Sequence, residues 1–315
     1  MLDMSVLIGC LLGLLIVVLA VGYYVFAKAC VRRKELPWMV EEEIKKTGFG
    51  KYYDCIVASD AWLREHNAQD VYIDSQDGLK LHGYWVPAEN PKGTILLAHG
   101  YRSTFLVDFG LAFVFYHALG MNILVPNQRS HGESEGKYIT FGVKESDDMK
   151  CWIDFHNETF GEYPLILSGL SMGASTMLYL ADQNLPQNVK CIIADCGFTS
   201  PKAIIDKVFR SIVHIPSDPF LWATELFART MAKFSLSQKD TCEVLSNAKL
   251  PVLMIHGMAD DFVPCDMTKL GFDACDGEKE ILLVAGAGHG TSFLTNKEIY
   301  TKTIISFLEQ YLDNF

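Results

Sequence analysis

Three successive patterns of apolar and polar residues divide this chain. Residues 4–27 contain no charged side chain, and residues 70–86 alternate apolar with polar positions around Asp77-Gly78, a strong hairpin turn. Beyond Pro91, short apolar runs bounded by turn residues recur, separated by segments with the length and period of helices. Strands buried on both faces of a sheet have this continuous apolar character. Such runs occupy residues 94–98, 122–125, 165–167, 191–194, 252–255 and 281–284.

The alternation of strand and helix predicts the fold class, which is α/β with a mostly parallel, doubly wound sheet. One interval departs from the alternation, because residues 197–249 separate two strands by more than a single crossover helix needs. This insertion is rich in aromatic and aliphatic residues, and Pro216 and Pro219 break it into at least two helices. We interpret it as a helical cap over the edge of the sheet where ligands bind. Helices packed on the sheet in the ordinary way are the alternative.

Residues 4–27 predict one membrane-spanning helix, because about 20 apolar residues cross the hydrocarbon core. Aromatic rings favour the headgroup region, and three lie near the end of the run: Tyr23, Tyr24 and Phe26. Four cations follow them: Lys28, Arg32, Arg33 and Lys34. The positive-inside rule then places the domain that follows on the cytoplasmic side, with the N-terminus outside. We therefore expect a single-pass membrane protein.

Two alternatives for this segment stay open. A cleaved signal peptide would end at Ala27-Lys28-Ala29, although a positive n-region is missing and the apolar run is longer than such peptides carry. A lipoprotein site would use Cys10 of Leu7-Ile8-Gly9-Cys10, although the apolar run continues past it. The predicted organisation is an anchor at 1–34, a juxtamembrane segment at 35–69 and a domain at 70–315 with its cap at about 197–249. The juxtamembrane segment is expected to form short helices or a plain spacer.

Composition narrows the classes of function. With 27 Lys plus Arg against 38 Asp plus Glu in 315 residues, the formal charge of −11 offers no general attraction to nucleic acid. The nine cysteines are scattered and form no C-x-x-C pair, which argues against a disulfide framework or a structural zinc site. The sequence also has no H-E-x-x-H and no P-loop motif, and its glycine-rich loop at residues 286–290 opens no dinucleotide-binding helix. We expect no metal and no cofactor.

Ser171 is the candidate nucleophile. It lies in Gly169-Leu170-Ser171-Met172-Gly173, which matches G-x-S-x-G, a pattern that alone also describes an ordinary turn of small residues. The context favours a catalytic serine, because a buried apolar run precedes the motif and residues 174–180 have the character of a helix. A strained turn between strand and helix is the setting in which such a serine is exposed for attack.

A serine nucleophile needs a histidine base that a carboxylate orients. His289 follows the last apolar strand in a glycine-rich loop, and Asp260 follows the strand before it. Asp261 and Asp195 remain alternative acids at the same sheet edge. His131 is the rival base, although it precedes the serine and would break the order Ser, Asp, His.

The oxyanion of a tetrahedral intermediate needs two hydrogen-bond donors. The backbone N–H of Met172, directly after the nucleophile, is one candidate. The second is the backbone N–H of Tyr101, which follows the strand-ending pair His99-Gly100. The alternative is that His99-Gly100 forms an ordinary strand-ending turn with no catalytic role. A backbone donor needs no particular side chain, so the sequence gives little sign of it.

Four motifs in this order resemble those of the α/β-hydrolase superfamily, in particular its bacterial, membrane-anchored serine hydrolases of the esterase and lipase type. They are Ala98-His99-Gly100, Gly169-Leu170-Ser171-Met172-Gly173, His256-Gly257-Met258-Ala259-Asp260 and Ala287-Gly288-His289. The resemblance covers Asp70 to the C-terminus. It implies that Asn127-Gln128-Arg129-Ser130-His131-Gly132 stands where such proteins commonly carry D-x-R-G-x-G. Asn127 and Ser130 depart from that pattern, which puts the local turn in question.

Together these observations predict a serine hydrolase that cleaves carboxylic esters through an acyl-enzyme. The apolar cap and the membrane helix favour small or lipid-like acyl substrates. Thioester or peptide hydrolysis would run on the same triad, and a catalytically silent binding protein could keep the same fold.

Overall fold

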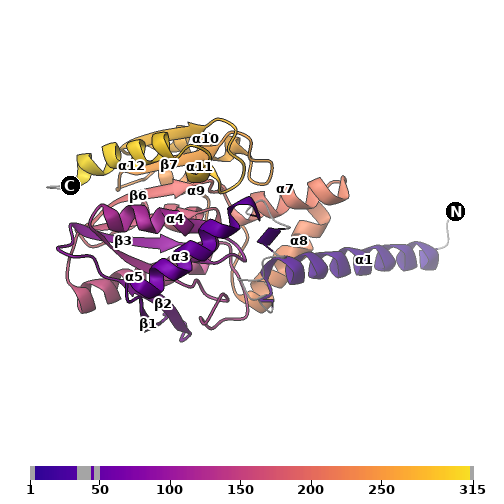
Figure 1. Ribbon diagram of the computed structural model, residues 1–315. Coiled ribbons are helices and arrows are strands. Elements are labelled where there is room, and N and C mark those ends of the chain that lie inside the picture. The colour runs from indigo at the N-terminus through magenta and orange to yellow at the C-terminus, as the bar shows by residue number, and fades with distance from the viewer. Residues whose placement is uncertain (1–3, 34–43, 46–49, 313–315) are drawn as a thin grey trace.

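The computed structural model describes residues 4–33, 44–45 and 50–312 (Figure 1). The remaining parts of the predicted juxtamembrane segment lie outside the described residues. In chain order the elements up to the nucleophile are α1 (Met4–Cys30), η1 (Gly50–Tyr52), α3 (Tyr53–Glu65), β1 (Gln69–Asp74), β2 (Lys80–Val86), β3 (Gly93–Ala98), α4 (Phe105–Ala118), β4 (Met121–Pro126), α5 (Val143–Phe160) and β5 (Leu165–Leu170). They are followed by α6 (Met172–Leu178), β6 (Val189–Asp195), α7 (Pro201–Val213), α8 (Asp218–Phe227), the π-helical turn η2 (Ala228–Ala232), α9 (Thr241–Leu245), β7 (Val252–Gly257), α10 (Cys265–Ala274), β8 (Lys279–Val284), α11 (Ser292–Thr295) and α12 (Lys297–Tyr311).

One eight-stranded sheet forms the centre of the domain, in the order β1-β2-β4-β3-β5-β6-β7-β8. The pairs β1–β2 and β2–β4 are antiparallel, and every pair from β3–β4 to β7–β8 is parallel. Asp77-Gly78 lies in the turn between β1 and β2, with Gly78 at φ +82°. Each of the six apolar runs lies within a strand. The predicted fold class is confirmed.

Side chains from the central strands alternate between two hydrophobic layers. In β3, Ile95 and Leu97 pack with α3, α4 and α12, whereas Leu96 and Ala98 pack with α5 and α6 on the other face. A parallel strand that is apolar at every position can therefore be buried on both sides. The helices enclose the sheet (Figure 1), and the carboxyl ends of its parallel strands carry the loops in which the candidate site residues lie.

The insertion between β6 and β7 contains α7, α8, η2 and α9. His214, at φ +60°, ends α7, and Pro219 lies in the first turn of α8, so the predicted break into at least two helices is confirmed. Apolar residues of the insertion, including Leu221 and Phe234, form a third buried cluster together with Met172. The insertion is thus packed against the residue that follows the candidate nucleophile.

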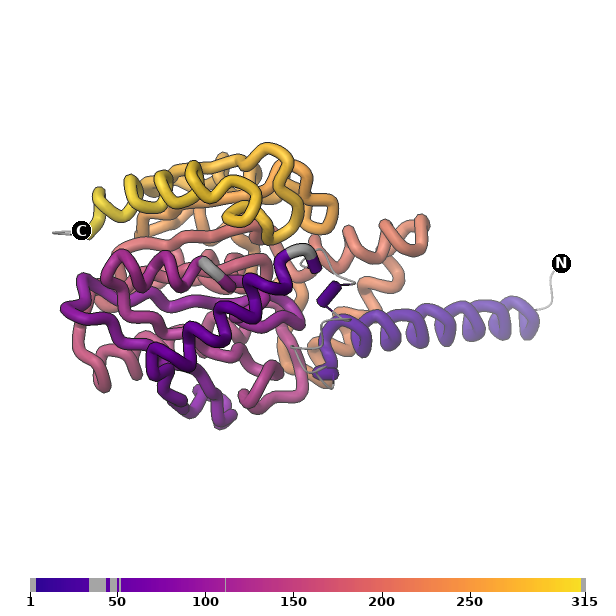
Figure 2. The backbone as a smooth tube through the Cα atoms, in the orientation of Figure 1, coloured from indigo at the N-terminus to yellow at the C-terminus, as the bar shows by residue number. Residues whose placement is uncertain are grey.

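Helix α1 extends away from the domain and touches it only with its C-terminal part (Figure 2). It is long and apolar enough to cross a membrane. Phe26 and Cys30, near its C-terminal end, are completely buried in the same cluster as Met172. The backbone of Gly22 lies so close to Ala223 of α8 that a Cβ at this glycine would collide with the alanine side chain. Small residues thus allow the two helices to approach closely.

Candidate active site

Ser171 occupies a strained turn between β5 and α6, at φ +56° and ψ −116°. Glycine is needed on both sides of it. A Cβ on Gly173 would collide with the carbonyl oxygen of Ala98, and a Cβ on Gly169 would collide with the backbone of Gly173. The backbone N–H of Ser171 donates to the carbonyl oxygen of Asp195 at 2.8 Å, which holds the turn against β6.

The loops after β7 and β8 bring Asp260 and His289 to this serine. The distance from His289 Nε2 to Ser171 Oγ is 2.9 Å, and that from His289 Nδ1 to Asp260 Oδ2 is 2.7 Å. An ionised carboxylate only accepts hydrogen bonds, so Nδ1 carries the proton and donates it to Asp260. Nε2 is then left as the acceptor for the serine hydroxyl, which is the tautomer that a general base requires.

Asp260 is fixed by three further contacts of its own loop and strand. Its Oδ1 accepts from the backbone N–H groups of Phe262 and Val263, both at 2.9 Å, and its Oδ2 lies 3.2 Å from His256 Nε2. Burial by itself would raise the pKa of Asp260, but the hydrogen bonds from His256 and His289 outweigh it and hold the pKa well below its usual range. The carboxylate therefore stays ionised beside the imidazole at neutral pH.

The two alternative acids, Asp261 and Asp195, lie in environments that differ from that of Asp260. Asp261 is exposed, and its backbone carbonyl accepts from Lys207 Nζ. Asp195 is buried, and Ser292 Oγ donates to it at 3.1 Å. Burial raises the pKa of Asp195 to about 6, against the effect of the nearby histidines and hydroxyls. Of the three acids, Asp260 is the one whose carboxylate accepts from His289.

The rival base, His131, is engaged on both ring nitrogens. Its Nε2 accepts from the backbone N–H of Arg102 at 3.0 Å, and its Nδ1 donates to the carbonyl oxygen of Arg129 at 3.0 Å. Burial lowers the pKa of His131 well below its usual value. The ring holds the turn at residues 127–132 against the loop after β3. Within that turn Ser130 sits at φ +65°, a conformation that favours glycine, and its Oγ donates to the carbonyl oxygen of Tyr138 at 2.9 Å.

The loop after β3 runs beside the candidate nucleophile. A Cβ on Gly100 would lie 3.3 Å from the Cβ of Ser171. The backbone N–H groups of Tyr101 and Met172 have no acceptor among the described residues. Both groups are therefore free to donate to a ligand, as an oxyanion hole requires.

Comparison with known proteins agrees with this architecture. Residues 93–230 match the family model described as the alpha/beta hydrolase fold. The chain is 28% identical to YqkD of Bacillus subtilis (strain 168) over 243 residues, which cover 77% of this chain and 79% of YqkD. The Pyrococcus furiosus esterase Pf2001 superposes with a TM-score of 0.65 at 20% identity, covering 80% of this chain and 94% of the esterase. The Pyrococcus horikoshii acylaminoacyl peptidase superposes with a TM-score of 0.58 at 18% identity, covering 79% of this chain and 42% of the peptidase.

The chain has the α/β-hydrolase fold. The resemblance inferred from the four motifs is thereby confirmed at the level of the fold. The roles of individual residues in this α/β-hydrolase rest on the geometry described above.

Sequence patterns did not reveal two residues that shape the site of this α/β-hydrolase. Asp108, in the first turn of α4, accepts from the backbone N–H of Gly100 and from Ser103 Oγ, both at 2.5 Å, and so holds the loop after β3 in place. No motif marks it, because its partners come from the preceding loop. His256 lies within the acid motif, four residues before Asp260, and that spacing is the signal that could have identified it.

The C-terminal end of α1 also contacts the loop after β3. Tyr101 Oη donates to the carbonyl oxygen of Ala29 at 2.8 Å. The guanidinium of Arg102 donates to the carbonyl oxygens of Lys28 at 3.0 Å and Val31 at 2.8 Å. The last carbonyls of a helix have no partner within the helix, so these side chains cap the C-terminus of α1. The end of α1 is therefore part of the structure around the active site.

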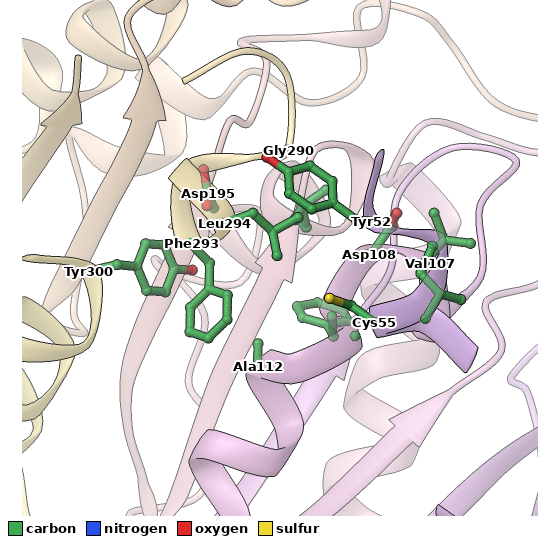
Figure 3. Close-up of a pocket in the computed structure, with 14 residues that line it drawn as sticks. Tyr52, Cys55, Val107, Asp108, Ala112, Asp195, Gly290, Phe293, Leu294 and Tyr300 are labelled. Atoms are coloured by element: carbon green, nitrogen blue, oxygen red, sulfur yellow. The ribbon is translucent and has the colours of Figure 1, made fainter. Parts of the chain in front are cut away.

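A small cavity lies beside Gly290, the residue after His289 (Figure 3). It is lined by residues of α3, α4 and α11, and by Asp108, Asp195 and Gly290. Its volume is about 30 Å³, room for about one water molecule, so it is too small to hold an acyl chain in this conformation. The cavity adjoins the triad because Gly290 directly follows His289.

One group of side chains in the described residues could be considered for a metal ion: Cys196, Asp260 and His289, whose ligand atoms lie within 4.8 Å of one another. Asp260 and His289 are already bonded to each other. Burial raises the pKa of the Cys196 thiol well above its usual value, which keeps the sulfur protonated. This donor set therefore does not fit a resident metal.

Proposed function

We propose that this α/β-hydrolase is a serine hydrolase that cleaves carboxylic ester bonds through an acyl-enzyme. The observation that carries the proposal is the chain of two hydrogen bonds from Ser171 to His289 and from His289 to Asp260. A serine hydroxyl is a poor nucleophile at neutral pH, and this arrangement supplies the base that it lacks.

In the proposed reaction, Ser171 Oγ attacks the ester carbonyl while its proton moves to His289 Nε2. Asp260 stabilises the imidazolium that forms and keeps its ring oriented. The negative oxygen of the tetrahedral intermediate accepts from the backbone N–H groups of Met172 and Tyr101. His289 then gives its proton to the departing alcohol. Water, activated by the same histidine, attacks the acyl-enzyme and releases the acid.

We also propose that α1 anchors the enzyme in a membrane as a single-pass helix, with the catalytic domain on the cytoplasmic side. The cations after the apolar run support this orientation. Burial of Phe26 and Cys30 against the domain supports a helix that is retained, because cleavage at Ala27-Lys28-Ala29 would remove buried surface and the carbonyls that Tyr101 and Arg102 bind. A membrane anchor favours small or lipid-like acyl substrates.

The first test is labelling of the full chain in detergent with a fluorophosphonate, followed by intact-mass spectrometry. The full chain is required because a domain that begins after α1 lacks the partners of Tyr101 and Arg102. One adduct on the wild type and none on Ser171→Ala is the expected result. A folded wild type that takes no adduct would overturn the proposal and favour a catalytically silent binding protein.

Substrate class is tested next on enzyme that has not been exposed to the fluorophosphonate. Ester, thioester and peptide substrates with the same acyl group compare the leaving groups directly. We expect the highest kcat/KM on the ester. A preference for the thioester or the peptide would keep the triad and replace the ester assignment, and the fold shared with an acylaminoacyl peptidase makes the peptide a necessary comparison.

A further inference from the structure

Exposed apolar side chains are concentrated on the cap helices next to α1. The segment at residues 211–216 is exposed throughout and contains no Asp, Glu, Lys or Arg. Within it Ile212 is 72% exposed, and Val213 and Ile215 are exposed as well. On α8, Trp222 is 56% exposed. We call residues 211–216 the cap tip. Large side chains gathered in this way on a folded surface indicate a binding surface.

The position of this surface relative to a membrane follows from α1. The fourteen residues from Met4 to Val17 are exposed along their whole length. At 1.5 Å per residue they span about 21 Å, less than the hydrocarbon thickness of about 30 Å. About 20 residues are needed, so the hydrocarbon extends to about Tyr23, where aromatic residues begin.

Helix α8 packs on α1 at this level. Gly22 lies against Ala223, and Phe26 lies near Phe227 with ring centroids 6.3 Å apart. Both contacts advance by four residues, so α8 runs in the same direction as α1. Trp222 therefore lies at the level of Gly22, and the cap tip, which precedes α8, lies further toward the N-terminus of α1. Figure 1 shows the end of α7 pointing to the side toward which α1 extends.

The arginine next to the cap tip, Arg210, is paired with acidic side chains. Arg210 Nε pairs with Asp206 Oδ1 at 2.7 Å, and Ser217 Oγ also donates to Asp206. Asp218 lies close enough to Arg210 to interact with its charge. Pairing of this kind lowers the free-energy cost of placing the cap tip near lipid.

We propose that the cap tip and Trp222 insert into the bilayer leaflet that α1 enters from the catalytic domain. This rests on the proposed membrane anchor and deepens it, because the occupant of the exposed apolar surface is the phospholipid bilayer itself. Insertion of an apolar helix face at the headgroup boundary is a common mode of membrane binding. It places the cap, and with it the cluster around Met172, directly at the membrane surface, so that an acyl substrate dissolved in lipid meets the cap first.

The test uses the full chain reconstituted into phosphatidylcholine vesicles whose acyl chains are brominated near the headgroup. Bromine quenches tryptophan fluorescence at contact distance, and Trp222→Phe identifies the share that comes from Trp222. We expect the brominated lipid to quench the wild type more strongly than Trp222→Phe. Equal quenching of the two proteins would overturn the proposal.

A second pair of variants tests the cap tip without changing the tryptophans. Ile212→Asp introduces a charge at a position that is 72% exposed, so folding is preserved and insertion is opposed; we expect loss of Trp222 quenching. Leu270→Asp, at a leucine that is 57% exposed on α10, is the matched control and leaves quenching unchanged. Unchanged quenching in Ile212→Asp would also overturn the insertion of the tip.

Alkaline carbonate extraction separates this proposal from the membrane anchor. If the chain leaves the vesicles, the anchor is wrong and the cap proposal falls with it. If the chain remains in the vesicles while Trp222 is not quenched, the anchor stands and the cap proposal alone is overturned.

Discussion

Replacement of Asp260 by asparagine changes the hydrogen bond to His289 but keeps the size and shape of the side chain at position 260. The two backbone N–H groups of Phe262 and Val263 both donate to Oδ1. In the variant they require an acceptor at that position, so the amide oxygen must occupy it. The amide NH₂ is then turned toward His289 Nδ1.

A donor at that position reverses the tautomer of the imidazole. His289 Nδ1 must accept from the NH₂, so the proton moves to Nε2, which can no longer take a proton from Ser171. We expect kcat to fall by about 10⁴, equivalent to about 5 kcal/mol of transition-state stabilisation. The structure gives no reason for a large change in KM, because Asp260 is buried behind the imidazole.

The assay is steady-state hydrolysis of a short-chain ester, together with the rate of fluorophosphonate labelling. Asp261→Asn is the matched control, because this neighbouring carboxylate is exposed; we expect it to retain wild-type turnover. Thermal unfolding of both variants checks that the fold is kept. If Asp260→Asn retains turnover within about tenfold of the wild type, Asp260 does not set the tautomer of His289, and the assigned triad is refuted.

Three further changes test other parts of the structure. Gly173→Ala places a methyl group against the carbonyl of Ala98 and should lower the unfolding midpoint sharply, whereas Gly13→Ala, with no atom within 4 Å, should leave it unchanged in a thermal melt. Arg102→Ala removes the guanidinium bonds to the end of α1 and should lower kcat about tenfold with KM unchanged, with partial recovery in Arg102→Lys; an unaltered kcat would contradict this positioning role. Burial raises the pKa of Asp195 to about 6, so its ionisation costs the folded state stability as the pH rises from about 4 to about 6. Asp195→Asn should remove about 2 kcal/mol of that pH dependence, as measured by denaturant unfolding at the two pH values.

The strands could be predicted because their signal is local. A parallel strand covered on both faces is apolar at every position, and each such run in this chain lies within a strand of the sheet. The hairpin turn at Asp77-Gly78 and the break between α7 and α8 could be predicted as well. They depend on the conformational freedom of glycine and the restricted backbone of proline. The segments at 35–43 and 46–49 lie outside the described residues, so the predicted juxtamembrane helices there stay a prediction.

The candidate triad was also accessible from sequence, because each member follows a parallel strand and the carboxyl ends of such strands meet at one edge. The sequence favoured Asp260 but left Asp261 and Asp195 as alternatives, since all three lie at that edge. The choice depends on which carboxylate accepts from His289, a contact between residues 29 positions apart that only folding establishes. The same holds for His131, whose two ring nitrogens are occupied by partners from a different loop and its own turn.

Sequence alone thus determined the fold class, the order of the strands along the chain, the candidate nucleophile and the apolar N-terminal helix, because each of these is encoded in neighbouring residues. Only the tertiary structure shows how the C-terminal part of α1 packs against the domain. Nothing near Gly22 or Phe26 in the sequence indicates that they pack on α8, or that Tyr101 and Arg102 bind the last carbonyls of the helix. Those contacts join segments about 70 to 200 residues apart, and their free energy becomes available only when the cap and the oxyanion loop are already in place.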